Sequence, residues 1–200
     1  MRMMTCALAV LCAVSLGAAQ GDGPQVVNAS FEQDRFTKYP GHAANNGGIS
    51  GWTYTGNVGV NPFWETRGER ERPRAPFVDN GQIPHGRQVA LMQNECTLRQ
   101  SVAGFRAGRR YRVTYHENAR QYRQAKMDPR LRVTLGGEVV VSEHGIQPVE
   151  PANSRSLPYD FVESAVFEAP RDGAFELAFV TTVGGGVTVL IDQVSIEKVE

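Results

Sequence analysis

The chain has 200 residues, and its 21 Lys and Arg balance 21 Asp and Glu to give a formal net charge of zero. The zero charge argues against a nucleic-acid partner bound through its phosphates, and the 41% hydrophobic content argues against a disordered tail. The length suits one domain with a sizeable core, and 21 Gly with 11 Pro predict many turns and few long helices.

A leader is predicted at the N-terminus. Arg2 precedes an uncharged stretch of apolar and small residues that ends at Ala19. This is the layout of a secretory signal peptide, and the stretch is short for a membrane anchor. We therefore expect residues 1–19 to be removed, leaving residues 20–200 as a single secreted, periplasmic or cell-surface domain without a membrane span. In that domain Cys96 has no partner for an internal disulfide.

After a loop-rich region over residues 37–85, apolar and polar residues alternate with the period of two that β-strands show. The predicted strands cover residues 86–93, 97–105, 111–115, 131–135, 138–144, 174–180 and 187–196. Gly136 and Gly137 predict a hairpin between the fourth and fifth of them. The pattern favours an all-β, two-sheet antiparallel sandwich or jelly roll. A plain immunoglobulin-like sandwich is the alternative, although a lone cysteine removes its usual disulfide.

Three groups of motifs occur in a distinctive order. They are VVNASFEQDRF with GGISGWTYTGNVGV, then IPHGRQVALMQNECTLRQSVAGFRAGRRYRVTYHENAR, and finally VTVLIDQVSIEKV. Together they resemble the secreted galactose-binding-like jelly rolls, which include carbohydrate-binding modules and cell-wall proteins of unknown function. The resemblance spans residues 26–199 and implies a two-sheet jelly roll that binds glycans without catalysis.

The same resemblance implies a structural calcium ion between the opening segment and the last strand. The matching positions are Asn28, Glu32 and Asp192, whose side chains offer the oxygen ligands that calcium prefers. Asp192 stands in an otherwise apolar strand, where a carboxylate needs hydrogen bonds or a cation. The alternative is a hydrogen-bonded clasp between the first and last strands. Phe31 and Trp52 in the opening motifs are predicted core residues.

Candidate ligand residues in the loop-rich region are Tyr54, Trp64 and Arg67. Sugar rings stack on aromatic side chains, and an arginine can bind an acidic sugar through paired hydrogen bonds. For Trp64 the alternative is a ring that plugs the loop over the sheet. For Arg67, which lies in the mixed-charge run ETRGERERPR, the alternative is an ordinary solvated loop.

A second candidate group lies in the strand YRVTYHENAR. Alternation places a polar row on the face opposite Val113 and Tyr115. This row consists of His116, Asn118 and Arg120. Glu117 then falls on the apolar side, which requires either a bulge in the strand or burial against an arginine.

These observations favour an exported, non-catalytic carbohydrate-binding or cell-surface recognition module whose partner is a polysaccharide or glycan. One alternative is a structural or protein-interaction module of the envelope or extracellular matrix, with a cell-surface protein as its partner. The other is a small cell-wall hydrolase. Ser142, His144 and Asp160 could be written as a triad, but no G-x-S-x-G elbow accompanies them. We therefore expect no catalytic residues.

Overall fold

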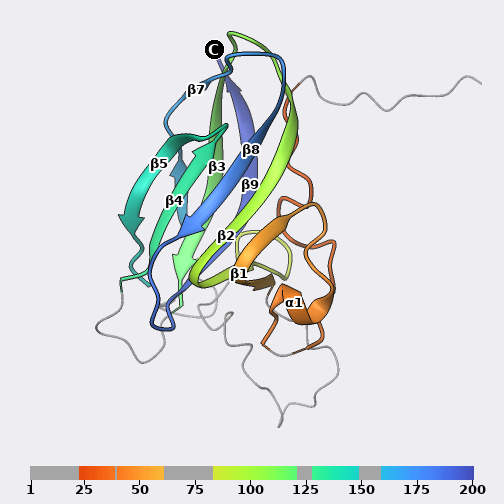
Figure 1. The fold of residues 1–200 in the computed structure, drawn as a ribbon, viewed down its shortest axis with the longest axis vertical. Helices are drawn as coiled ribbons and strands as arrows, with labels where there is room; N and C mark the ends of the chain where they lie inside the picture. The colour runs from red at the N-terminus through yellow and green to blue at the C-terminus, as the bar shows by residue number, and fades with distance from the viewer. Residues whose placement is uncertain (1–22, 39, 61–82, 121–127, 149–158) are drawn as a thin grey trace, which may run out of the picture.

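The computed structural model describes residues 23–38, 40–60, 83–120, 128–148 and 159–200, which form one short helix and nine strands (Figure 1). Their bounds are α1 Ala43–Asn46, β1 Thr53–Val60, β2 Ala90–Phe105, β3 Arg110–Ala119, β4 Arg130–Leu135, β5 Glu138–Gly145, β6 Asp160–Glu163, β7 Phe167–Glu168, β8 Gly173–Thr181 and β9 Thr188–Val199. None of the helical residues in these ranges belongs to a segment long and apolar enough to span a membrane. The predicted leader lies outside the described residues.

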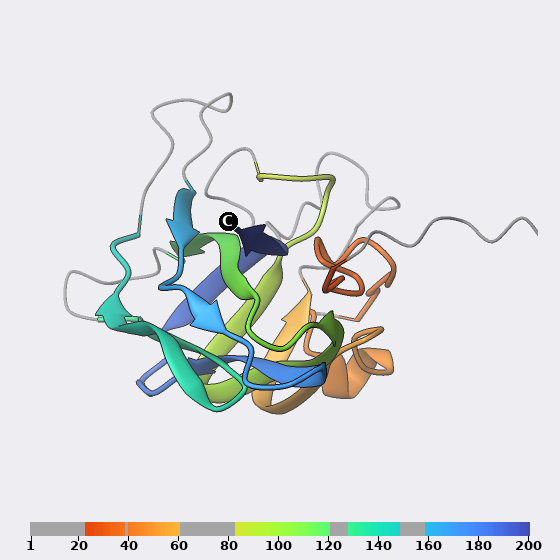
Figure 2. The ribbon, with the colours of Figure 1, turned by 90° about the horizontal axis from the view of Figure 1, so that it is seen from above.

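The strands pair antiparallel in the order β5, β4, β8, β2, β9, β3, β6, with β1 beside β2 and β7 beside β3. The long strand β2 belongs to both layers, because residues 90–93 pair with β9 and residues 96–105 pair with β8. The sheet therefore curls into a first layer of β5, β4 and β8 and a second layer of β9, β3 and β6. Figure 2 shows this curl from above the strands. The all-β, antiparallel jelly-roll sandwich predicted from the sequence is confirmed.

The core between the layers comes from the alternation of each strand, which sends every second side chain inward. Trp52 is 5% exposed, and its ring centroid lies 5.5 Å from that of Phe31 and 6.3 Å from that of Phe179. The predictions that Phe31 and Trp52 are core residues are confirmed. The opening segment is thus anchored to the sandwich by aromatic packing.

The structure differs from the predicted strands in its first half. Residues 86–93 and 97–105 are predicted as two strands, but β2 runs through both, and β1 pairs with it on either side of the junction. At the junction Asn94 adopts a φ of 60°, and its Oδ1 accepts the Gly186 N–H at 2.6 Å. β1 occupies part of the region predicted as loop. Its Gly59 is required by packing, since a Cβ there would overlap the carbonyl of Gly41. β6 and β7 are too short to give a clear alternation.

Candidate functional site

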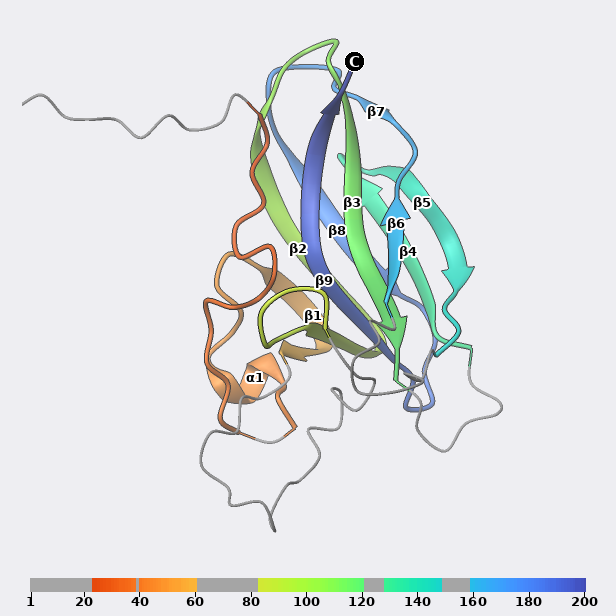
Figure 3. The same ribbon diagram turned by 180° about the vertical axis from the view of Figure 1, so that it is seen from behind.

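The outward side of the second layer carries an apolar floor. Leu91 on β2 lies opposite Leu190 on β9, and Leu190 lies opposite Asn118 on β3. Directly opposite residues of antiparallel strands share a face, so these three side chains lie on one side of the sheet. Leu91 and Leu190 form a buried cluster with Val89 and Tyr159, separate from the main core. We name this side of β2, β9, β3 and β6 the outer face (Figure 3).

The centre of the outer face combines an imidazole, an aromatic ring and a carboxyl group. His116 on β3 lies opposite both Asp192 on β9 and Phe161 on β6, and its ring centroid is 5.2 Å from that of Phe161. The side chain of Phe161 is 57% exposed. Nδ1 of His116 is buried without a hydrogen-bond partner in the described part of the chain, and burial lowers the pKa of His116. This surface therefore offers a ring for stacking beside a neutral imidazole.

The predicted polar row lies along this face but is unevenly accessible. Asn118 is 1% exposed, and its Oδ1 accepts the Ala119 N–H at 2.7 Å. Arg120 is half-buried and follows the end of β3, where its backbone N–H donates to the Thr188 carbonyl at 2.9 Å. His116 and Arg120 are therefore the accessible members of the row, and Asn118 lies beneath them.

The loop-region candidates do not join this row in the described structure. Tyr54 on β1 lies opposite Leu98 and packs against the main core. The strands β2 and β9 separate β1 from β3. Trp64 and Arg67 lie outside the described residues. Their roles as ligand contacts stay predictions.

Asp192 is fully buried on the outer face of β9. One of its carboxylate oxygens accepts the His85 N–H at 2.8 Å, and the other accepts the Gln193 N–H at 2.7 Å. Burial raises the pKa of Asp192 to about 7; these two hydrogen bonds oppose the shift, and the negative charge of Glu32 adds to it. Asp192 is thus a carboxyl group able to exist in either protonation state near neutral pH.

The three predicted calcium ligands do not all converge. Glu32 lies close enough to Asp192 to act on its charge, and Glu32 Oε1 accepts the backbone N–H groups of Arg87 and Gln88, both at 2.7 Å. The Asn28 amide has other partners. Its Nδ2 donates to an Asp34 carboxylate oxygen and to the Ser50 carbonyl, and its Oδ1 accepts the Gln33 N–H. Two mutually repelling carboxylates fit a divalent cation. Across the described ranges, however, no group of three or more His, Cys, Asp or Glu side chains forms a metal site.

A small pocket of about 200 Å³ adjoins Glu32. Its lining residues are Glu32, Asp34, Arg35, Arg87 and Gln88. The polar groups of the pocket already have partners within the protein. The Asp34 carboxylate accepts the Ser50 N–H, and the Glu32 carboxylate accepts the Gln88 N–H. Gln88 Nε2 in turn donates to the Phe31 carbonyl at 2.6 Å. These polar groups therefore hold the opening segment against residues 85–88.

A second polar cluster lies on the inner side of β3. Glu117 is 4% exposed, and its Oε1 accepts a hydrogen bond from His144 Nε2 on β5 at 2.7 Å. The register of β3 against β9 does shift between Thr114 and His116, yet Glu117 stays buried. The predicted arginine partner is wrong, because the partner is His144. Sequence reasoning missed this pair since β3 and β5 are distant in the strand order.

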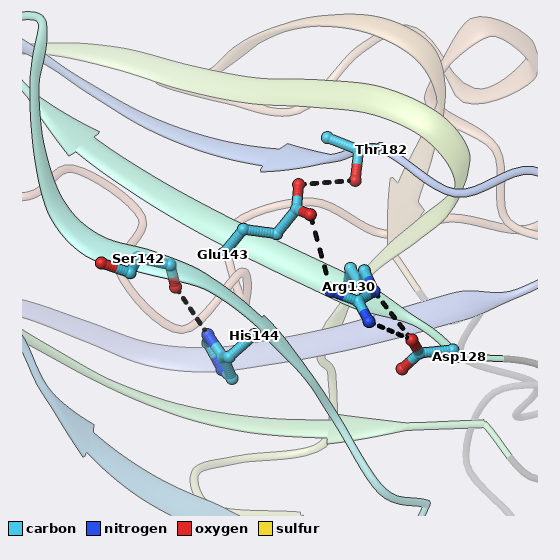
Figure 4. Close-up of polar contacts among 6 residues, drawn as sticks. All are labelled: Asp128, Arg130, Ser142, Glu143, His144 and Thr182. Atoms are coloured by element: carbon cyan, nitrogen blue, oxygen red, sulfur yellow. Dashed lines mark hydrogen bonds and ion pairs between the residues drawn. The ribbon is translucent and has the colours of Figure 1, made fainter.

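The surroundings of His144 do not form a serine triad. Its Nδ1 lies 3.1 Å from the backbone carbonyl oxygen of Ser142, not from the hydroxyl (Figure 4). Nearby, Arg130 lies 2.6 Å from Asp128 and 3.8 Å from Glu143 through two of its nitrogens. These exposed pairs contribute little to stability. The inner cluster is therefore a buried acid–imidazole contact next to a solvated ion-pair network.

Comparison with known proteins identifies related sequences and folds. The family model described as HpiC1-like, HpiC1 cyclase, matches residues 22–191, which is well over half of the chain. No curated protein matches the sequence.

Among solved structures, a cyclase from Fischerella sp. TAU in complex with 4-(1H-indol-3-yl)butan-2-one has a TM-score of 0.54 at 15% identity, over 88% of this chain and 98% of that one. TmCBM61 in complex with β-1,4-galactotriose has a TM-score of 0.51 at 15% identity, over 86% and 96% of the two chains. The tandem CBM22 domain of Paenibacillus barcinonensis Xyn10C has a TM-score of 0.50 at 14% identity, over 92% and 48%. These similarities establish a galactose-binding-like β-sandwich, the fold expected from the sequence.

Proposed function

This chain belongs to the HpiC1-like family, and we propose that it binds a short carbohydrate chain on the outer face. The observation that carries the proposal is the exposed ring of Phe161 beside the imidazole of His116, with Arg120 further along the same strand face. A sugar ring can stack its C–H face on Phe161 while its hydroxyls bind the polar row.

The fold comparisons support a carbohydrate as the first ligand to test. TmCBM61, which has a similar fold, was solved with β-1,4-galactotriose. Sugar hydroxyls exchange hydrogen bonds with water for hydrogen bonds with protein at a small net gain. We therefore expect modest affinity, and the apolar floor of Leu91 and Leu190 supplies little contact of its own, because both side chains are fully buried.

The test is isothermal titration of the full chain with β-1,4-galactotriose and with xylohexaose. Phe161→Ala should weaken binding about three- to tenfold through the loss of ring stacking. Arg120→Ala should weaken binding while the fold is retained. Val139→Ala is the matched control, because Val139 is 53% exposed but lies on β5. An unchanged affinity in Phe161→Ala, or a lack of binding to either sugar at millimolar concentration, would refute the proposal.

Asp192 favours a second candidate, acid catalysis on a small molecule bound at the same face. A carboxyl group whose pKa is about 7 suits proton transfer near neutral pH. The matching family and one solved relative are described as cyclases, which supports this candidate.

A proton-transfer assay separates the two candidates. The ketone 4-(1H-indol-3-yl)butan-2-one, bound by the Fischerella cyclase, can exchange its α-hydrogens with D₂O through its enol. Catalysis would speed the loss of the α-hydrogen NMR signal, and Asp192→Asn would abolish the effect. Exchange at the rate of buffer alone would remove this candidate.

A further inference from the structure

The inner side of β3 holds a buried carboxylate directly between two residues of the outer face. Glu117 follows His116, precedes Asn118 and faces the interior, where His144 binds it at 2.7 Å. The strand β5 stands at one end of the strand order, and β3 is next to last at the other end. Both layers approach each other here, since Ala165 N–H also donates to the Val140 carbonyl at 2.8 Å. The Glu117–His144 contact therefore joins the edge strand β5 of the first layer to β3 of the second layer.

The geometry of His144 fixes where its protons lie. Nδ1 faces the Ser142 carbonyl, which can only accept, so Nδ1 carries a hydrogen. Nε2 faces a carboxylate oxygen, so the 2.7 Å contact must contain a second proton. A neutral ring carries a hydrogen on only one of its two nitrogens, so loss of one proton costs His144 either the Ser142 contact or the Glu117 contact. The contact is therefore strongest while the ring holds both protons, because only then does a charged donor face the carboxylate and both nitrogens have a partner.

Other charged and titratable groups face the pair from neighbouring strands. On β3, burial and the adjacent Glu117 raise the pKa of Tyr115, which keeps its hydroxyl neutral. On β6, Asp160 lies opposite Glu117. On β4, Arg130 lies opposite Gly145, next to His144, and binds Asp128 and Glu143. On the outer face of the neighbouring β9, Asp192 lies opposite His116.

Partial burial lowers the pKa of His144, but its hydrogen bonds to Glu117 and to the Ser142 carbonyl, together with the Glu117 charge, raise it overall. A raised pKa in the folded state means that the pair stabilises the fold fully below the ordinary histidine pKa of about 6.5. This contribution is lost as the pH rises through the higher folded value.

We propose that the Glu117–His144 contact is a proton-dependent clasp that holds the end of β3, and with it the outer-face binding site, in the geometry of this structure. The binding role rests on the function proposed above. Protonation closes the clasp on the inner side of the strand and fixes His116 and Asn118 on the other side. Deprotonation weakens the clasp, leaves the end of β3 held by its pairing with β9 and β6 alone, and lowers ligand affinity.

The first experiment follows His144 and the outer face by NMR on the full chain. The His144 ring signals should titrate above the ordinary histidine value, and Glu117→Gln should lower that midpoint by removing the negative charge. The backbone amide of Asn118 should shift with the His144 midpoint in the wild type. His144→Gln keeps a hydrogen-bond donor for Glu117 but has no titrating group. The Asn118 amide of this variant should therefore no longer shift with a midpoint at the His144 pKa. His42→Gln is the control, because it replaces a histidine at the start of α1, beside β1 and away from β3 and the clasp, and it should leave the Asn118 shift unchanged.

The second experiment titrates β-1,4-galactotriose at pH 6 and pH 9. Wild-type affinity should fall about fivefold over this range, at the lower end of typical coupling between sites, while that of His144→Gln should change less. A His144 midpoint at or below the ordinary value, or an Asn118 titration that is identical in wild type and His144→Gln, would overturn the clasp. A coupled Asn118 titration without sugar binding would support the clasp and refute the carbohydrate proposal alone.

Discussion

Replacing Asp192 with asparagine should change how stability depends on pH. The wild-type carboxyl group is fully buried, and burial raises its pKa from 3.8 to about 7. Between these two values the folded protein holds a proton that the unfolded chain has released, so stability falls as the pH rises. At about 1.4 kcal/mol per pKa unit, the full loss is up to about 4 kcal/mol above pH 7.

Asparagine removes this dependence because it is neutral at every pH. It also has one acceptor oxygen for two backbone donors, the N–H groups of His85 and Gln193. The unpaired donor costs about 1–3 kcal/mol at all pH values. The advantage of the wild type over Asp192→Asn should therefore shrink by about 2–3 kcal/mol between pH 5 and pH 8.

Urea unfolding of both proteins at pH 5, 6, 7 and 8 measures this difference, and other carboxylates cancel in the subtraction. Glu32→Gln is the matched control. Glu32→Gln removes a negative charge that raises the Asp192 pKa. The pH range over which stability falls should therefore move to lower pH in this variant. A difference between wild type and Asp192→Asn that is constant with pH, within about 0.5 kcal/mol, would refute the assignment of a raised pKa to Asp192.

Three further predictions concern the packing of the fold and the proposed binding of calcium. Trp52→Ala should destabilise the protein by about 3–5 kcal/mol in urea unfolding, because it empties a core site; a cost below about 1 kcal/mol would contradict this packing. Gly59→Ala should lower the melting temperature, because the new Cβ would overlap the Gly41 carbonyl. Gly23→Ala is the control and should leave the melting temperature unchanged, because a Cβ there meets nothing within 4 Å. Equal melting temperatures of the two variants would contradict this packing. If Glu32 and Asp192 bind calcium, the ion should raise the melting temperature by mass action, and EDTA should reverse the rise. Asp192→Asn should abolish this response. A calcium effect that persists in Asp192→Asn would place the ion elsewhere.

Local alternation made the second layer predictable. In β3 the period of two alone assigns Val113 and Tyr115 to the interior and His116 and Asn118 to the opposite face, and the structure agrees. The same reasoning marked Asp192 as a carboxylate in need of compensation. It could not name the compensating group, because the His85 N–H lies 107 residues away in the sequence.

The features that sequence reasoning missed depend on contacts between distant segments. β1 contains Gly56 and Gly59, which weaken a strand pattern, and Gly59 is explained only by the close approach of Gly41. Phe161 lies in a strand that covers only Asp160–Glu163, too short for periodicity to reveal. The partner of Glu117 follows from the curl of the whole sheet, which brings β5 to β3.

Glu117 interrupts the apolar inner face of β3 between the core residues Tyr115 and Ala119, and this has a physical consequence for the binding site. A strand in a sandwich normally buries one apolar face, which fixes its register and position. From His116 onward that fixing is weaker, because Glu117 replaces an apolar side chain on the inner face. A buried carboxylate stabilises its surroundings only while it is paired, so the His144 contact takes over the role that apolar packing has in the first part of the strand. The position of the outer-face residues therefore depends on a polar contact whose strength changes with pH.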